Sequence, residues 1–298
     1  MRKVKIITDS CSDLTPELLE RYDIDYCRMC TVEDGVESPA LLSWSYEDAH
    51  RLYDTIRGGK RITTAQVSVE EFTAVFTKYL EAGMDIVYIA CCQKQSGSVN
   101  TGSVVARGLL EKYPDAKIFC IDSLNACIGE GIVAIEAAKL AGEGKSAEEI
   151  CDHVTAIRKN VHEYATVHTL DHLKKAGRVS ASSAFFGNLI GVKPILVADK
   201  EGAQVAFKKV KGRQAALREI VALLKEGISD PESTTVYLAH ADCTAEEVEA
   251  LRAIIEAEIA PKEIYPCLIG PIIGASVGPD TIGVWALGKP VTFTASDK

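Results

Sequence analysis

The sequence lacks the features that identify several large classes of protein. None of its apolar runs approaches the roughly 20 residues that a helix needs to cross a bilayer. Charged residues occur too early in the opening segment, residues 1–9, for a secretory signal peptide. The formal net charge of −9 argues against nucleic acid or an anionic membrane surface as the main partner. We therefore expect a cytoplasmic protein with no nucleic-acid partner and no stable membrane insertion.

Metal-binding and nucleotide-binding motifs are also missing. Cys27 and Cys30 form a CxxC, but no second CxxC completes a zinc site, and the six histidines show no HExxH spacing. The segment around this pair reads as a strand, on which residues three apart face opposite sides. Most of the ten cysteines lie in apolar runs, where a free thiol behaves as a small hydrophobe. We expect neither a metal nor a cofactor.

The first half of the chain alternates strand and helix patterns. The short apolar run 86–92 is typical of a strand buried on both faces, and a helix is predicted over 98–113. Further strands are predicted over 25–32 and 117–123. Strands separated by helices indicate a mostly parallel sheet covered on both faces.

The second half has a different pattern. Strands dominate it, and residues 198–202 carry a hairpin signal that favours antiparallel or mixed pairing. Helices are predicted over 169–176 and 182–190, and a closing strand over 291–294. Since 298 residues suffice for two cores, we predict an α/β protein of two domains. Residues 1–160 form a parallel-sheet domain, and residues 161–298 form a mixed α/β domain.

Three segments combine small or hydroxyl residues with apolar neighbours: residues 62–68, 91–101 and 269–283. The first two precede predicted helices, whose free N–H groups and positive dipole end favour an anion. Each segment also has a purely structural interpretation. In the structural interpretation of the segment 91–101, Ser98 is an N-cap that follows a turn at Gly97. Residues 63–68 would lead into a well-capped helix. The glycines of the third segment would allow two backbone segments to cross closely.

The segment that begins at Leu170 ends a predicted helix with two lysines and a glycine, and Arg178 follows it. Arg178 is a candidate for contact with a ligand or a partner. Residues 185–196 are very apolar for a surface segment. They either line a long hydrophobic cavity or belong to the core.

Together these motifs resemble the DegV family, the bacterial fatty-acid-binding proteins that serve as the B subunit of fatty acid kinase. The sequence TDSCSDL at residues 8–14 begins the match. TTAQVS (63–68) is close to the family pattern TTSQPS, QSGSVNT (95–101) to LSGTYQS, LKKAGRVS (173–180) to LKKGGRIS, and residues 270–283 to GPVIGAHTGPGTLG. The resemblance covers essentially the whole chain.

The resemblance implies two α/β domains with a long-chain fatty acid (C16–C18) between them and no other cofactor. A fatty acid kinase subunit would phosphorylate the carboxyl group, so this chain would be a carrier and not an enzyme. The head group would be bound by Thr63, Thr64, Cys92, Gln93, Ser96, Gly97, Ser98 and Ser276. The acyl chain would be lined by Leu170, Phe185, Phe186, Leu189, Ile190, Ile195, Ile272 and Ile273.

The chain departs from the family pattern at the head group. The histidine of the glycine-rich loop is replaced by Ser276, and a pair of serines by Cys92 and Gln93. A charge-assisted hydrogen bond is roughly twice as strong as a neutral one, so losing the histidine weakens the grip on a carboxylate. A buried acyl chain contributes about 0.8 kcal/mol per methylene, which outweighs the loss of about 1.5–3 kcal/mol from one such bond.

Two other functions stay open at this point. Cys92 at a helix N-terminus, where the pKa of a thiol falls, suggests an acyl-transfer enzyme with His168 or His172 as the base. The altered head-group residues are equally compatible with another amphipathic anion, such as an isoprenoid.

Overall fold

The computed structural model describes residues 2–179 and 191–294. Its strands are β1 (Val4–Asp9), β2 (Ile24–Cys27), β3 (Cys30–Glu33), β4 (Val36–Pro39), β5 (Ile62–Ala65), β6 (Asp85–Ala90), β7 (Ile118–Asp122), β8 (Val161–Thr166), β9 (Val192–Ala198), β10 (Gln204–Lys211), β11 (Thr235–His240), β12 (Glu263–Leu268) and β13 (Ile282–Leu287). Its α-helices are α1 (Pro16–Arg21), α2 (Tyr46–Arg57), α3 (Val69–Glu81), α4 (Ser98–Leu110), α5 (Ile128–Gly142), α6 (Ala147–Ile157), α7 (Asp171–Ala176), α8 (Arg213–Gly227), α9 (Ala245–Glu258) and α10 (Pro271–Val277).

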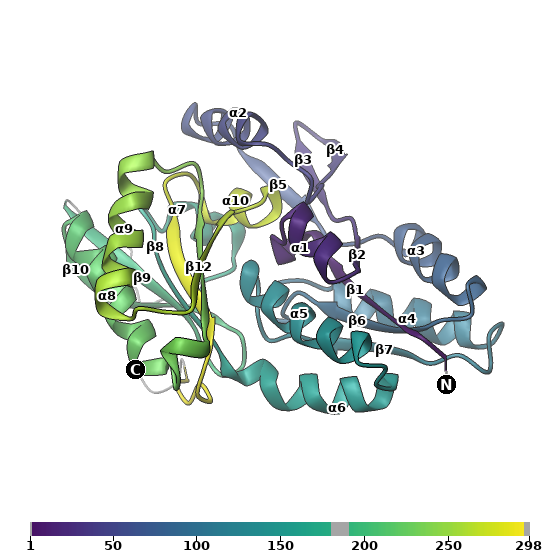
Figure 1. The fold of residues 1–298 in the computed structure, drawn as a ribbon. Helices are drawn as coiled ribbons and strands as arrows, with labels where there is room; N and C mark the ends of the chain where they lie inside the picture. The colour runs from purple at the N-terminus through teal and green to yellow at the C-terminus, as the bar shows by residue number, and fades with distance from the viewer. Residues whose placement is uncertain (1, 180–190, 295–298) are drawn as a thin grey trace.

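The first sheet is fully parallel, in the order β2-β1-β6-β7, as the strand and helix alternation predicts. Alternate residues of its strands face opposite sides. Ile6 and Val87 belong to the core under α5 and α6, whereas Ile7 and Tyr88 belong to the core under α3 and α4. Figure 1 shows these two helix layers on either side of the sheet. The carboxyl ends of β1 and β6 therefore share one edge, where α/β proteins place ligands.

The single strand predicted over 25–32 is wrong. Its first part is β2, in the parallel sheet, and its last part is β3, in a small antiparallel sheet of order β4-β3-β5. Cys27 and Cys30 thus lie on two different strands. Asp34 and Gly35 both have positive φ, 50° and 82°, which forms the tight turn of the β3–β4 hairpin. Residues 62–65 of the segment predicted as a loop form strand β5 of this sheet.

The second sheet is mixed, in the order β10-β9-β8-β13-β11-β12, with only β11 and β12 parallel. The predicted hairpin is the antiparallel β9–β10 pair. Ile195 and Val284 face α8 and α9, which cover the outer side of the sheet (Figure 1), while Ala165, Leu196 and Trp285 face the first half of the chain.

Two other predictions for the second half have different outcomes. Residues 291–294 form no strand, although the Val291 N–H donates to the Lys159 carbonyl and the Lys200 N–H to that of Phe293. The helix predicted over 182–190 lies outside the described residues.

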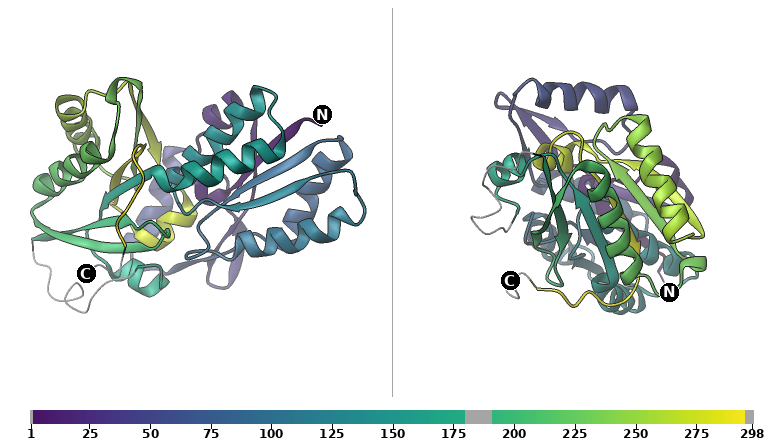
Figure 2. Two further views of the ribbon diagram at one scale, coloured as in Figure 1. Left: turned by 90° about the horizontal axis from the view of Figure 1, so that it is seen from below. Right: turned by 90° about the vertical axis from the view of Figure 1, so that its left-hand side faces the viewer.

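Two helices connect the halves. Helix α5 is apolar on nearly every side because it packs on β1 and β6 as well as on β8 and β13. The left view of Figure 2 shows helix α10, in yellow, between the two halves of the chain. The sequence analysis expected a glycine-rich loop here, but Pro271 begins a helix. The helix ends before Gly278, which adopts a φ of 80°. Among the described residues, no helix is long and apolar enough to cross a membrane.

Candidate functional site

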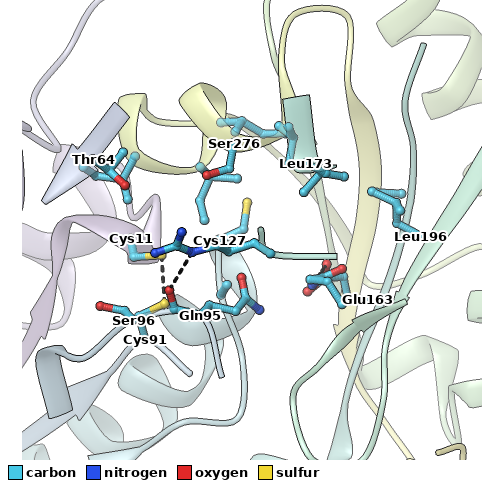
Figure 3. Close-up of a pocket in the computed structure, with 18 of the residues that line it drawn as sticks. Cys11, Thr64, Cys91, Gln95, Ser96, Cys127, Glu163, Leu173, Leu196 and Ser276 are labelled. Atoms are coloured by element: carbon cyan, nitrogen blue, oxygen red, sulfur yellow. Dashed lines mark hydrogen bonds between the residues drawn. The ribbon is translucent and has the colours of Figure 1, made fainter. Parts of the chain in front are cut away.

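A cavity of about 160 Å³ lies between the two sheets and against α10. Both halves of the chain contribute to its wall (Figure 3). The lining consists of Cys11, Met29, Thr64, Gln66, Cys91, Gln95, Ser96, Gly97, Ala126, Cys127, Glu163, Ala165, Leu173, Arg178, Leu196, Gln204, Ile269, Ile272, Ile273, Ser276, Val277, Thr281 and Trp285.

Hydroxyl and amide groups gather on one side of this cavity. Thr64 comes from β5, Ser96 from the loop between β6 and α4, and Ser276 from α10 (Figure 3). Gly97 is the N-cap of α4, and a Cβ there would lie 2.1 Å from the Gln66 side-chain oxygen, so a larger residue would require that glutamine side chain to move. The structure thus brings together four of the predicted head-group residues: Thr64, Ser96, Gly97 and Ser276.

Arg178 is the only basic side chain in the lining formed by the described residues. Helix α7 ends at Gly177, whose φ of 69° turns the chain so that Arg178 follows directly. The Arg178 Nε–H donates to the Gln95 carbonyl over 3.2 Å, which joins the second half of the chain to the β6–α4 loop. The guanidinium is thereby held at the loop that carries Ser96.

Four predicted head-group residues do not line the cavity. Ser98 is buried as the first residue of α4, not its N-cap, and its Oγ accepts from the Val67 N–H at 3.3 Å. Gln93 is exposed and its amide donates to Asn100. Thr63 lines a neighbouring hollow instead.

Cys92 contradicts its predicted role most clearly. Its thiol is fully buried and donates to the Gly202 carbonyl at 3.3 Å, away from the cavity. Burial, with help from the nearby Asp122 charge, raises the pKa of Cys92 to about 12. The expected lowering of the pKa by the helix N-terminus is therefore wrong, because Cys92 lies six residues before α4 in a desolvated position.

The apolar side of the cavity is built from α10, α7 and the second sheet. Ile272 and Ile273 line it, together with Leu196 from the apolar run 185–196 and Leu173, which was not among the predicted lining residues. Ile195 packs under α8 instead, because neighbouring strand residues face opposite sides, and Leu170 is part of the core. Phe185, Phe186, Leu189 and Ile190 lie outside the described residues.

A buried thiol and acid cluster forms the floor near the hydroxyl side. The Sγ atoms of Cys11 and Cys91 are 3.2 Å apart, and Glu130 has a carboxylate oxygen within 4.8 Å of both. Glu130 accepts from the Thr8 hydroxyl at 2.6 Å, and burial raises its pKa well above the usual range. The hydrogen bond to Cys11, together with burial, raises the pKa of Cys91. Burial thus favours the uncharged form of each of these groups.

A second polar group lies on the far side of the cavity. Glu163, Gln204 and Trp285 project from β8, β10 and β13, and Figure 3 shows Glu163 across the cavity from Thr64 and Ser96. Sequence analysis missed all three because each is a single residue within a strand, with no motif to mark it.

A neighbouring hollow shares Thr64, Arg178 and Ser276 with the main cavity. Its lining adds three further cations, Lys60, Arg61 and Lys175, of which Lys60 is paired with Glu33 and Asp34 outside the lining. We call these three residues and Arg178 the cationic hollow. Its position next to the hydroxyl side suits a group of high negative charge.

Comparisons with known proteins agree with this architecture. A family model described as "Uncharacterised protein, DegV family" matches residues 3–289. A DegV domain-containing protein of Clostridium perfringens is 34% identical over 288 residues, covering 97% of this chain and 98% of that protein. Among solved structures, a DegV lipid-binding protein from Thermotoga maritima has a TM-score of 0.85 at 26% identity, covering 97% of this chain and all of that one. A stearic acid-binding protein from Eubacterium ventriosum also has a TM-score of 0.85, at 25% identity, covering 97% of this chain and 99% of that one.

Proposed function

Since the chain belongs to the DegV family, we propose that it binds a long-chain fatty acid of C16–C18 in the cavity between its two sheets. The chain acts as a carrier with no cofactor of its own, and it presents the carboxyl group to a fatty acid kinase subunit. The structural relatives at 25–26% identity are described as lipid-binding and stearic acid-binding, which supports this ligand class.

The distribution of polar groups in the cavity carries the proposal. Hydroxyl groups of Thr64, Ser96 and Ser276 and the Arg178 guanidinium gather at one side, while Ile272 and Leu196 belong to an apolar wall. Only an amphipathic ligand with an anionic end matches both. An acyl chain of about 15 methylenes contributes on the order of 12 kcal/mol before association costs.

Arg178 gives the head-group end of the cavity a positive charge that the sequence analysis did not predict there. With serine in place of the family histidine, the cradle predicted from the sequence is neutral. Arg178 adds a permanent positive charge beside the hydroxyls. We assign to it the charge-assisted hydrogen bond that Ser276 cannot supply.

The cationic hollow supports presentation to a kinase. In that step a carboxylate oxygen attacks the terminal phosphoryl group of the kinase's nucleotide, which yields an acyl phosphate and a nucleoside diphosphate. The product carries more negative charge than the substrate at the same place. Lys60, Arg61 and Lys175 would stabilise that charge next to the Arg178 guanidinium.

Mass spectrometry of organic-phase extracts from the purified protein tests the ligand class. We expect about one C16–C18 fatty acid per chain, retained through purification and lost after delipidation. An isoprenoid or another amphipathic anion in its place would favour the alternative ligand, and a protein that carries and binds no lipid would contradict the proposal. The burial and raised pKa of the Cys92 thiol argue against an acyl-transfer enzyme. Unchanged lipid loading in Cys92→Ser would agree with that conclusion.

A further inference from the structure

Two thiols lie side by side in the floor of the cavity. Cys11 belongs to the 3-10 helix η1 (Ser10–Ser12) that follows β1, and Cys91 is the first residue after β6. Both residues line the cavity, and their Sγ atoms are 3.2 Å apart (Figure 3). A disulfide has an S–S length of about 2.05 Å. Bond formation therefore requires the two sulfur atoms to approach each other by little more than about 1 Å.

The backbone holds the two cysteines in place for such a bond. Strands β1 and β6 are parallel neighbours, with Ile7 paired with Tyr88. The buried Asp9 carboxylate accepts from the Cys11 N–H at 2.9 Å and from the Cys91 N–H at 3.2 Å. Neighbouring strands run about 4.8 Å apart, a spacing within the Cα separations of about 4.4–6.8 Å that a disulfide spans. A bond between these sulfur atoms thus needs no rearrangement of the sheet.

A shared metal ion fits this geometry less well than a direct bond. Glu130 has a carboxylate oxygen near both sulfur atoms, but its Oε1 already accepts from the Thr8 hydroxyl group. Two thiolates bound to one zinc ion at its tetrahedral angle lie about 3.8 Å apart. The observed sulfur separation is shorter than that.

The two nearest other thiols in the sequence and in the cavity have different partners. Cys92 follows Cys91 directly, but its thiol donates to the Gly202 carbonyl, away from the cavity. Cys127 also lines the cavity, but its thiol forms a hydrogen bond with the Asp13 carboxyl group. The geometry therefore favours one pairing, between Cys11 and Cys91.

Both thiols are protonated at rest, which makes them slow to react. The hydrogen bond to Cys11, together with burial, raises the pKa of Cys91. Against the lowering effect of its hydrogen bond with Cys91, burial and the nearby Asp9 charge raise the pKa of Cys11. Since the thiolate is the nucleophile, oxidation needs a reagent that enters the cavity and reacts with a small thiolate fraction. Hydrogen peroxide, which is small and uncharged, meets this requirement.

We propose that Cys11 and Cys91 are a redox-active pair, which a peroxide oxidises to a disulfide when the cavity is empty and which a bound fatty acid shields. The shielding rests on the proposed function, whereas the cross-link does not. The bond would join η1 to the start of the loop that carries Ser96 and Gly97. In a reducing compartment such a disulfide is transient, so the redox state of the pair would follow the lipid occupancy of the carrier.

The oxidation proceeds in two steps. One cysteine, as its thiolate, attacks a peroxide oxygen and breaks the O–O bond, which leaves a sulfenic acid and a hydroxide ion. The hydroxide takes up the proton of that first thiol. The second sulfur then attacks the sulfenic sulfur, and its proton leaves with the sulfenic oxygen as water. The two cysteines together lose two electrons, and the peroxide gains them and ends as two water molecules.

Peptide mapping of the full-length protein after hydrogen peroxide treatment tests the proposal. Delipidated protein is treated in the presence of EDTA, its remaining thiols are alkylated, and it is digested with trypsin without reduction. We expect the peptides 6–21 and 79–94, which contain Cys11 and Cys91, to be linked. Stearate at about ten times its dissociation constant leaves about one chain in ten empty, so the linked product should then form about tenfold more slowly.

Adjacent cysteines provide matched variants. Peptide 79–94 also contains Cys92. Cys92→Ser should form the linked product at the parent rate, and Cys91→Ser should lose it. A parent protein without the linked product, or a Cys91→Ser variant that retains it, would overturn the pairing. If Cys91→Ser does not fold, fragment masses of the linked parent peptides identify which of the two cysteines is bonded.

The two levels of the proposal fail separately. Equal rates of cross-linking with and without stearate, in protein that demonstrably binds stearate, would overturn the shielding. If the protein binds no stearate, the proposed function itself is contradicted. The linked product of the delipidated protein still decides the pairing in that case.

Discussion

Arg178 combines two roles at the level of single residues. Its Nε–H holds the Gln95 carbonyl, and its guanidinium supplies the only positive charge in the described cavity lining. It follows a helix C-terminus that sequence rules locate well, because Gly177 with positive φ ends α7. A ligand carboxylate at the hydroxyl side would therefore depend on this residue more than on any single hydroxyl.

Arg178→Gln should weaken fatty-acid binding about tenfold. The glutamine retains a donor but loses the charge, and charge-assisted hydrogen bonds contribute roughly 1.5–3 kcal/mol. Fluorescent-probe displacement by stearate measures the change. Methyl stearate has no carboxylate, so its affinity should not change. Arg107→Gln, on an exposed position of α4, serves as the control, and a similar loss in that variant would contradict the assignment.

Glu163 should make stability depend on pH. Burial raises its pKa from 4.5 to about 7, so between these values the folded chain holds a proton that the unfolded chain releases. Stability therefore falls as pH rises through this window. Glu163→Gln carries no charge at any pH. Its free energy of unfolding relative to the parent protein should rise from pH 5 to pH 8 by up to about 3 kcal/mol.

Urea unfolding at both pH values measures this difference. Glu37→Gln, on the exposed strand β4, is the control and should leave the pH dependence of the parent unchanged. In a Trp44→Phe background Trp285 is the sole tryptophan, so its fluorescence should report the Glu163 titration. A constant stability difference between pH 5 and pH 8 would show that Glu163 titrates normally.

Helix α10 is the element that most determines the shape of the site. Gly274 faces Tyr53 so closely that a Cβ would lie 2.4 Å from the phenol oxygen. That phenol is buried and donates to the Ile269 carbonyl at 2.7 Å, just before the helix. The glycine therefore sets how near α10 comes to α2, and with it the position of Ser276.

Gly274→Ala should destabilise the protein by about 1–3 kcal/mol, because the added methyl group overpacks the contact with Tyr53. Gly108→Ala is a matched change in α4, where a Cβ meets no atom within 4 Å. That control should be neutral or stabilising by about 0.5–1 kcal/mol. Urea unfolding measures both variants, and equal stability of the two would contradict the packing argument.

Local patterns predicted most helices and the parallel sheet, but not which segments meet. The caps at Thr15, Ser45 and Ser68 act within one turn, so sequence spacing reveals them. The division between β2 and β3 depends on the antiparallel pairing with β5, which is a long-range contact. Ser96 and Ser276 were recognisable by family resemblance. Glu163, Gln204 and Trp285 become a group only through the register of four strands.

Across the whole molecule, charged side chains join the two halves at one edge. Arg57, at the end of α2, forms ion pairs of 2.6 Å with both Asp242 and Asp280 from the second half. It is 31% exposed, so solvent and salt screen these pairs in part. These two ion pairs nonetheless link α2 to the loops after β11 and α10, close to the candidate site.

Arg57→Ala should lower the free energy of unfolding by about 1 kcal/mol at low salt and by less at 1 M salt. Arg51→Ala removes a comparable exposed arginine whose pair, with Asp48, stays within α2, and it should have a smaller effect. Thermal denaturation at both salt concentrations measures the two variants. An identical loss for both would mean that the link between the halves adds nothing beyond a local pair.

The cavity wall is shared between residues before position 160 and residues after it, and this has an evolutionary consequence. The Thr64 and Ser96 hydroxyls at one side of the cavity and the row of Glu163, Gln204 and Trp285 at the other are encoded far apart in the gene. Recombination between two relatives near the middle of the gene would keep both sheets intact while joining two half-sites of different ancestry. Ligand choice is therefore inherited only when both halves are inherited together.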